Sequence, residues 1–171
     1  MPSKPLTRKP EPASLTYRDH ITMADWPAIR ALVLKTGVFN EREVEGVREL
    51  MDDTVNRPTW GNYRFWVAQD GATITGFTCV SPIHGTPDRY DMYWLAVHPD
   101  FHGHGCASRL VALAIDGVRA QGGKKMYVET STRDVYEAAR KFYLAAGFAL
   151  EGTLPDYYAD GDGKAIFAKR L

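Results

Sequence analysis

The residues best suited to chemistry lie in a short glycine-containing turn at positions 102–107, which reads His-Gly-His-Gly-Cys-Ala. An apolar and aromatic run at 90–97 predicts a buried strand before this turn, and Pro99 ends the strand because proline has no N–H for the ladder. An apolar stripe at helical spacing follows and predicts a helix that stops at Gly122. The first N–H groups of a helix lack internal partners and carry the positive end of its dipole. The order strand, glycine turn, helix therefore predicts an anion site, although such turns also serve for tight packing alone.

Three kinds of phosphate-binding turn can be compared with these residues. A Walker loop needs Lys and then Ser or Thr after its last glycine, and no Lys or Thr follows Gly105. A dinucleotide fingerprint needs Gly or Ala where this chain has Ser108, and it begins closer to its strand. A pyrophosphate turn with Gln or Arg, two residues, Gly, one residue, and then Gly or Ala is matched at every position except the first, His102. The third pattern is the best match.

Residues 97–107 resemble motif A of the GNAT superfamily of acyl-CoA-dependent N-acetyltransferases, and residues 140–148, RKFYLAAGF, resemble its second motif, a helix ending in FYxxxGF. The two motifs in this order are much more specific than either alone, and the resemblance covers residues 15–171. The chain departs from the family at His102, where Gln or Arg is usual. It departs again at Tyr136, where many members carry an Asn that contacts the cofactor.

The resemblance implies that acetyl-CoA is the co-substrate. Backbone groups of Leu95 and Val97 are expected to bond its pantetheine, and the turn is expected to hold its pyrophosphate. The cofactor-binding residues that the resemblance implies are Leu95, Val97, His102, Gly103, His104, Gly105, Cys106, Ala107 and Tyr136.

Two residues are candidates for the catalytic proton transfers. By resemblance, Tyr143 is the general acid that protonates the sulfur of coenzyme A; the alternative is a tyrosine at the edge of the core with its hydroxyl bonded to backbone. Glu129 lies on the predicted strand 125–130. In the ribosomal-protein N-terminal acetyltransferases a strand glutamate at a similar place acts as base, although here its spacing to the tyrosine is longer. A structural ion pair or hydrogen bond is the alternative for Glu129.

Four nearby residues that could ligate metal are His98, His102, His104 and Cys106, but their spacing fits no standard structural zinc pattern. We therefore expect no metal. Cys106 has no obvious paired base, so we expect it to pack as a small apolar residue rather than act as a nucleophile.

The bulk properties favour one ordinary soluble domain of 171 residues. Lys plus Arg and Asp plus Glu each total 21, so net charge gives no argument for a nucleic-acid partner. No apolar run is long enough for a membrane span and no signal-peptide core is present, so we expect no membrane partner. The two cysteines are too few for a disulfide framework, which favours a reducing cytoplasm.

Residues 1–14 contain four prolines without periodicity and predict a flexible N-terminal arm, followed by a single domain at 15–171. Period analysis predicts the order β-α-α-β-β-β-α-β-α-β-β, an α+β fold with a mixed central sheet flanked by helices. The last two strands are predicted at 148–154 and 165–169, with a polar connection at 155–163. By resemblance, two adjacent parallel strands splay apart and the pantetheine lies between them.

The sequence thus predicts an N-acetyltransferase that moves an acetyl group from acetyl-CoA directly to a primary amine of a small molecule or peptide. By resemblance, residues 37–60 and 154–163 recognise the acceptor, and the aromatic and acidic groups of the second segment suit a cationic amine. The alternatives are a non-catalytic acyl-CoA-binding or sensing domain and transfer of a longer acyl group. Homodimers are common in such folds by resemblance.

Overall fold

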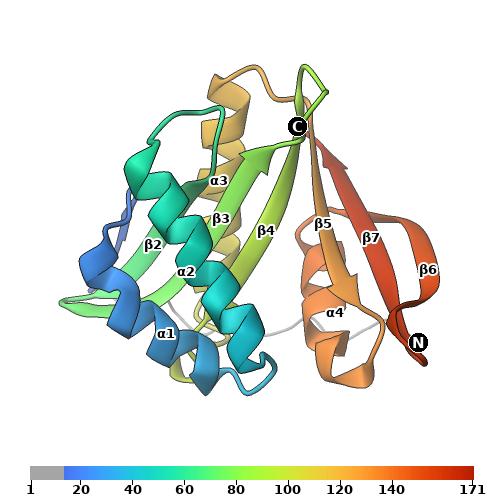
Figure 1. Cartoon of the computed structure of the whole chain (residues 1–171), viewed down its shortest axis with the longest axis horizontal. Coiled ribbons are helices and arrows are strands. Elements are labelled where there is room, and N and C mark those ends of the chain that lie inside the picture. Colours follow the sequence, from blue (N-terminus) through green and yellow to red (C-terminus); the bar gives the residue numbers. More distant parts are fainter. Residues whose placement is uncertain (1–13) are drawn as a thin grey trace.

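The computed structural model describes residues 14–171, so the arm predicted for residues 1–14 lies almost wholly outside the described part of the chain. Seven strands form one sheet in the spatial order β1-β2-β3-β4-β5-β7-β6 (Figure 1). The strands are β1 (Leu15–Arg18), β2 (Arg64–Asp70), β3 (Thr73–Pro82), β4 (Arg89–Val97), β5 (Lys125–Ser131), β6 (Ala149–Ala159) and β7 (Asp162–Arg170). The helices are α1 (Trp26–Lys35), α2 (Glu41–Asn56), α3 (Cys106–Ala120) and α4 (Glu137–Ala145). The predicted α+β fold with a mixed sheet is confirmed.

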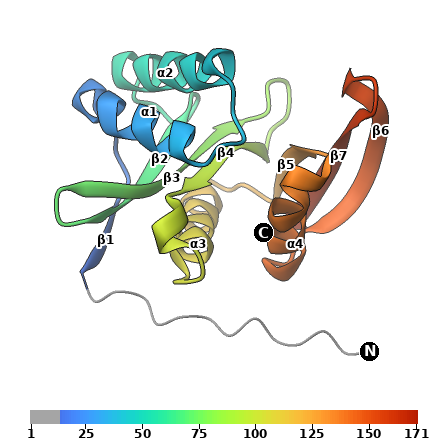
Figure 2. The same cartoon turned by 90° about the horizontal axis from the view of Figure 1, so that it is seen from below.

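The helices lie on both sides of the sheet (Figure 2). On one side, which we call the front face, α1 and α2 cover β2, β3 and β4; α3 and α4 lie on the other side, the back face (Figures 1 and 2). In the part of the chain that the structure describes, no helix covers β5, β7 and β6 on the front face (Figure 1). Within residues 14–171, no helix is long and apolar enough to cross a membrane.

The two parallel strands at the centre of the sheet diverge part-way along their length. β4 and β5 pair from Arg89 opposite Lys125 to Met92 opposite Val128, and no pairing is recorded beyond that point, although β4 continues to Val97. On the other edge of β4, the register with β3 shifts so that Tyr93 is an extra, bulged residue. A bulge bends its strand and increases the local twist, which is consistent with β4 turning away from β5 here.

The polar connection predicted at 155–163 is wrong, because most of it is strand. β6 continues through Pro155 to Ala159 and β7 begins at Asp162. Proline is tolerated there because β6 is the edge strand of the sheet and its outer N–H groups pair with nothing in the sheet. The pairing of β6 with β7 is irregular around this proline, since the register shifts between Leu154 and Ala159. The β6–β7 hairpin curves toward the front face, so it lies opposite α2 across the part of that face that no described helix covers (Figure 2).

Helix α3 packs closely on the sheet at Gly76 of β3. A Cβ added there would lie 3.1 Å from the carbonyl oxygen of Ala96, 3.2 Å from the sulfur of Cys106 and 3.2 Å from a methyl group of Leu110. One of these contacts is to backbone, which cannot rotate away. The absence of a side chain at Gly76 therefore sets how near the first turns of α3 lie to β3.

We predict that Gly76→Ala lowers the free energy of unfolding by about 1–3 kcal/mol, because overpacking forces the start of α3 away from the sheet. Gly46→Ala is the matched control: Gly46 lies within α2 with open space around its Cβ position, so the same change should stabilise by about 0.5–1 kcal/mol. Chemical denaturation of the two variants measures both effects. Equal stabilities would contradict the packing argument.

Candidate active site

The turn before α3 presents backbone N–H groups that the protein leaves without partners. Gly105 caps the helix with φ 85° and Gly103 has φ 79°, values in the left-handed region that glycine adopts without strain. Among the described residues, the N–H groups of Gly103, His104, Gly105 and Ala107 have no hydrogen-bond acceptor. Consecutive free amides at a helix N-terminus are suited to an anion.

His102 holds this turn against the end of β4 through two hydrogen bonds. Its N–H donates to the carbonyl oxygen of Pro99 at 3.1 Å, and its ring Nε2 lies 2.8 Å from the carbonyl oxygen of Val97. Since a carbonyl can only accept, the ring must donate from Nε2. Both contacts tie the turn to the end of β4. The amides available to a ligand therefore begin at Gly103 rather than at His102.

His104 supplies an observation that fits a phosphate ligand. Its ring Nδ1 is buried and has no hydrogen-bond partner. A buried polar atom without a partner costs about 1–3 kcal/mol, and an acceptor bound at the turn would remove that cost for His104. A phosphate oxygen held by the neighbouring amides would accept from this nitrogen. The residues present thus fit a pyrophosphate.

The free edge of β4 faces the region where β5 diverges. The N–H of His98 donates to Thr75 of β3 at 2.8 Å, and the carbonyl oxygen of Trp94 accepts from the hydroxyl of Thr78 at 2.8 Å. Backbone groups alternate along a strand, so those of Leu95 and Val97 point away from β3 and toward β5. The Val97 carbonyl is occupied by His102, but its N–H and the groups of Leu95 remain directed at the diverging edge.

Tyr143 of α4 is buried on the back face. Its ring packs against the rings of Phe142, Phe148 and Phe167 with centroids 5.6–6.0 Å apart, and it belongs to the same apolar cluster as Val97. Burial raises the pKa of its phenol, so the hydroxyl keeps its proton at neutral pH. The hydroxyl has no hydrogen-bond partner within the described residues, so the backbone bond of the alternative interpretation is not made.

Glu129 of β5 points to the front face and forms an ion pair. One of its carboxylate oxygens lies 2.5 Å from Nζ of Lys164 on β7. That ammonium is buried and also lies 3.8 Å from the ring centroid of Tyr157. The ion pair that the sequence left open as the alternative for Glu129 is therefore present.

Tyr136 spans two elements far apart in the sequence. Its hydroxyl donates to the carbonyl oxygen of Val38 at 3.2 Å, and its ring lies edge-on to Phe39, which in turn packs on Trp94 of β4. The side chain thus joins the segment before α4 to the loop between α1 and α2. It connects these segments across the end of the sheet where β4 and β5 diverge.

The sequence reasoning did not identify Asp91, which lies on β4 just before the strands diverge. It is half-buried, and its carboxylate makes no hydrogen bond or ion pair with any described residue. A single carboxylate in the otherwise apolar and aromatic run 90–97 was the signal that could have found it.

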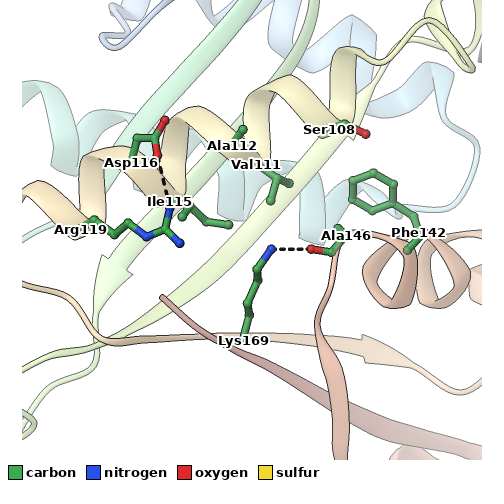
Figure 3. A pocket seen from close by; sticks show the side chains of 10 residues that line it. Ser108, Val111, Ala112, Ile115, Asp116, Arg119, Phe142, Ala146 and Lys169 are labelled. Carbon is green, nitrogen blue, oxygen red and sulfur yellow. Dashed lines mark hydrogen bonds and ion pairs between the residues drawn. The ribbon is translucent and has the colours of Figure 1, made fainter.

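Two hollows adjoin these residues. On the front face, a cavity of about 470 Å³ lies between the end of α2 and the β3–β4 connection, and Tyr63, Ser81 and Tyr93 are among its lining residues; Asp91, which lies opposite Ser81 in the sheet, is not one of them. On the back face, a cleft of about 330 Å³ runs between α3 and α4 (Figure 3). Only the end of this cleft at Ser108 lies near the turn before α3, because Arg119 at its other end is about 16 Å further along α3.

No group of three or more His, Cys, Asp or Glu side chains is placed to hold a metal ion in the described residues. Cys106 is buried, in accord with its expected packing role.

Residues 26–148 match the model of the acetyltransferase (GNAT) family. The fold matches a crystal structure of a GNAT-family protein from Desulfovibrio desulfuricans, with a TM-score of 0.88 and 31% identity, covering 91% of this chain and 98% of that one. It also matches the structure of yncA from Salmonella typhimurium with its cofactor acetyl-CoA, at a TM-score of 0.73 and 20% identity over 92% of this chain and 94% of that one. Rat N-acetyltransferase 8F1 is 31% identical over 91 residues, which are 52% of this chain and 40% of the rat protein. This chain therefore spans less than half the length of that relative. On the family match and the shared fold, the chain belongs to the GNAT family of acetyltransferases.

Proposed function

We propose that this protein transfers an acetyl group from acetyl-CoA directly to a primary amine of a small molecule or peptide. The observation that carries the proposal is the combination of turn amides that have no acceptor within the described residues with a neighbouring pair of parallel strands that separate. The first feature suits a diphosphate, and the second exposes backbone groups of β4 to an extended ligand. The yncA protein, solved with acetyl-CoA, has the same fold, which supports this cofactor.

The chain's own residues would hold the co-substrate at three places. The amides of Gly103, His104 and Gly105 would bind the diphosphate, and Nδ1 of His104 would add a side-chain donor. Backbone groups of Leu95 and Val97 would bond the amides of the pantetheine arm. When bound there, acetyl-CoA supplies an activated thioester. Juxtaposition of the amine and this thioester would offset roughly 7–11 kcal/mol of the barrier.

The acceptor would approach from the front face, where β5, β7 and β6 are uncovered. Tyr93, Tyr157 and Tyr158 are each about half-exposed there, and Asp91 and Glu129 supply carboxylates. Aromatic faces and carboxylates both attract an ammonium group. These features support an amine as the acceptor, because they favour its cationic form in the encounter complex.

We predict that coenzyme A binds the turn before α3 and that Gly105→Ala weakens binding at least tenfold. A Cβ on this left-handed residue costs about 1–2 kcal/mol and alters the direction of the amides. Gly122→Ala is the matched control, because Gly122 has φ 80° at the other end of the same helix and should lower stability without lowering affinity. Isothermal titration calorimetry measures both. Equal loss of affinity in the two variants would contradict the assigned location.

We predict that Tyr143→Phe lowers kcat by ~10²–10⁴-fold with little change in coenzyme A affinity, because it removes the proton donor for the departing thiolate. Phenylalanine keeps the ring packing, so the fold should be retained. Tyr90→Phe is the control: Tyr90 is buried in the same cluster but lies on the paired part of β4. An unchanged kcat in Tyr143→Phe, with the chemical step shown to limit turnover, would remove this role.

Thiol release separates the proposal from its alternatives. Purified protein is mixed with acetyl-CoA and a panel of amines, and a disulfide reagent reports free coenzyme A. Amine-dependent release supports acetyl transfer. Tight coenzyme A binding without release for any amine would instead favour an acyl-CoA-sensing domain, and faster release from longer thioesters would favour transfer of a longer acyl group.

A further inference from the structure

The position of Asp91 places its carboxylate beside the point at which β4 and β5 separate. In the register of the sheet, Asp91 lies opposite Ser81 of β3 and Tyr127 of β5. Its neighbours Tyr90 and Met92 pack with α3 on the back face, so alternation along the strand directs Asp91 to the front face. This is the face from which the acceptor amine would arrive.

Asp91 differs from most other half-buried aspartates of the described residues, because no hydrogen bond or ion pair holds its carboxylate; Asp70 at the end of β2 is another without one. Asp25 pairs with Arg18, Asp88 with Lys124 and Asp162 with Arg133, whereas the Asp91 carboxylate makes no hydrogen bond or ion pair among the described residues. An unpaired carboxylate in a partly desolvated position is unfavourable. An approaching ammonium group would relieve that cost.

The charged groups around Asp91 come from two neighbouring strands. Burial is the main cause that raises the pKa of Asp91 to about 6, the Glu129 carboxylate raises it further, and Lys164 opposes them. The phenols nearby stay neutral, since burial raises the pKa of Tyr93 to about 12 and that of Tyr158 upward as well. The remaining neighbours directly across the strands are Ser81 and Tyr127.

Glu129 is poorly placed to take a proton. Its oxygen is held by the ammonium of Lys164 at 2.5 Å, so protonation of that oxygen would break a partly buried ion pair. A general base works best when its pKa lies near the operating pH and its oxygen is free to reach the substrate. No hydrogen bond or ion pair among the described residues holds the Asp91 carboxylate, and its raised pKa of about 6 lies near neutrality.

We propose that Asp91, and not Glu129, is the general base that accepts the proton of the acceptor ammonium group, and that the Glu129–Lys164 pair is a positioning element that sets its charge environment. This assignment rests on the proposed acetyl transfer.

The ammonium N–H bond breaks and its proton goes to the carboxylate of Asp91; the freed nitrogen lone pair then forms the bond to the thioester carbonyl carbon. As the carbon–sulfur bond breaks, the sulfur takes the electron pair and a proton from Tyr143. The second proton lost from nitrogen restores the phenol through solvent, and Asp91 releases its proton to water.

The test is the pH dependence of kcat/KM for an amine that the wild type acetylates. Wild type should lose activity below about pH 6, where Asp91 becomes protonated. Asp91→Asn should lower the rate ~10²–10⁴-fold and abolish that acidic limb. Glu129→Gln should keep a limb but move it to lower pH, because it removes a like charge, and Lys164→Met should move the limb to higher pH. Asp19→Asn is the matched control, because Asp19 is exposed just after β1 and lies outside the segments assigned to the acceptor and the co-substrate; it should leave the profile unchanged.

Two further readouts keep this assignment separate from the proposed function. The pKa of Asp91 is followed in each variant from the carbon-13 shift of its carboxyl group, and coenzyme A affinity is measured by calorimetry. A wild type that binds coenzyme A but acetylates no amine would overturn the proposed function, and the base with it. If the wild type is active, two results would overturn the assignment of the base to Asp91 and leave the proposed acetyl transfer standing. One is an acidic limb that survives in Asp91→Asn, and the other is a limb that disappears only in Glu129→Gln. A carboxyl titration of Asp91 below pH 4 would also overturn it.

Discussion

The separation of β4 from β5 determines where the proposed site can lie. Up to Met92 and Val128 the two strands satisfy each other's backbone groups, and beyond that point β4 has an edge without a strand partner. Unpaired backbone groups inside a sheet are costly unless something else bonds them. The bulge at Tyr93 helps to create the opening, and the turn that follows β4 places free amides at its mouth. An extended ligand with a charged diphosphate at one end satisfies both sets of groups.

The proposed proton donor and the proposed proton acceptor lie on opposite faces of the sheet. The back face supplies α3 with its turn and the buried phenol of Tyr143, whose pKa is raised by burial. The front face supplies carboxylates and half-exposed aromatic rings, left uncovered where α1 and α2 end and the β6–β7 hairpin begins. A proton donor on one side and a proton acceptor on the other suit a reaction in which a proton leaves the amine and another joins the thiolate. Tyr136 links the two halves through its contact with the α1–α2 loop.

Local sequence patterns predicted the elements but not their mutual geometry. The glycine turn and the helix after it, α3, were predictable because φ near 80° at Gly103 and Gly105 favours glycine. The ion pair of Glu129 and the isolation of Asp91 were not, because each depends on strands that meet only in the folded sheet. The extent of β6 was missed because Pro155 normally ends a strand, and its edge position is a property of the whole sheet.

Amide hydrogen exchange with and without coenzyme A can locate the bound co-substrate, because it reports on the individual N–H groups of the turn. Saturating coenzyme A should slow exchange at Gly103, His104, Gly105 and Ala107, and at Leu95 and Val97 on the free edge of β4, while the amides of α2 should be unchanged. Saturation of the protein with no protection at the turn, or protection confined to another part of the chain, would contradict this location.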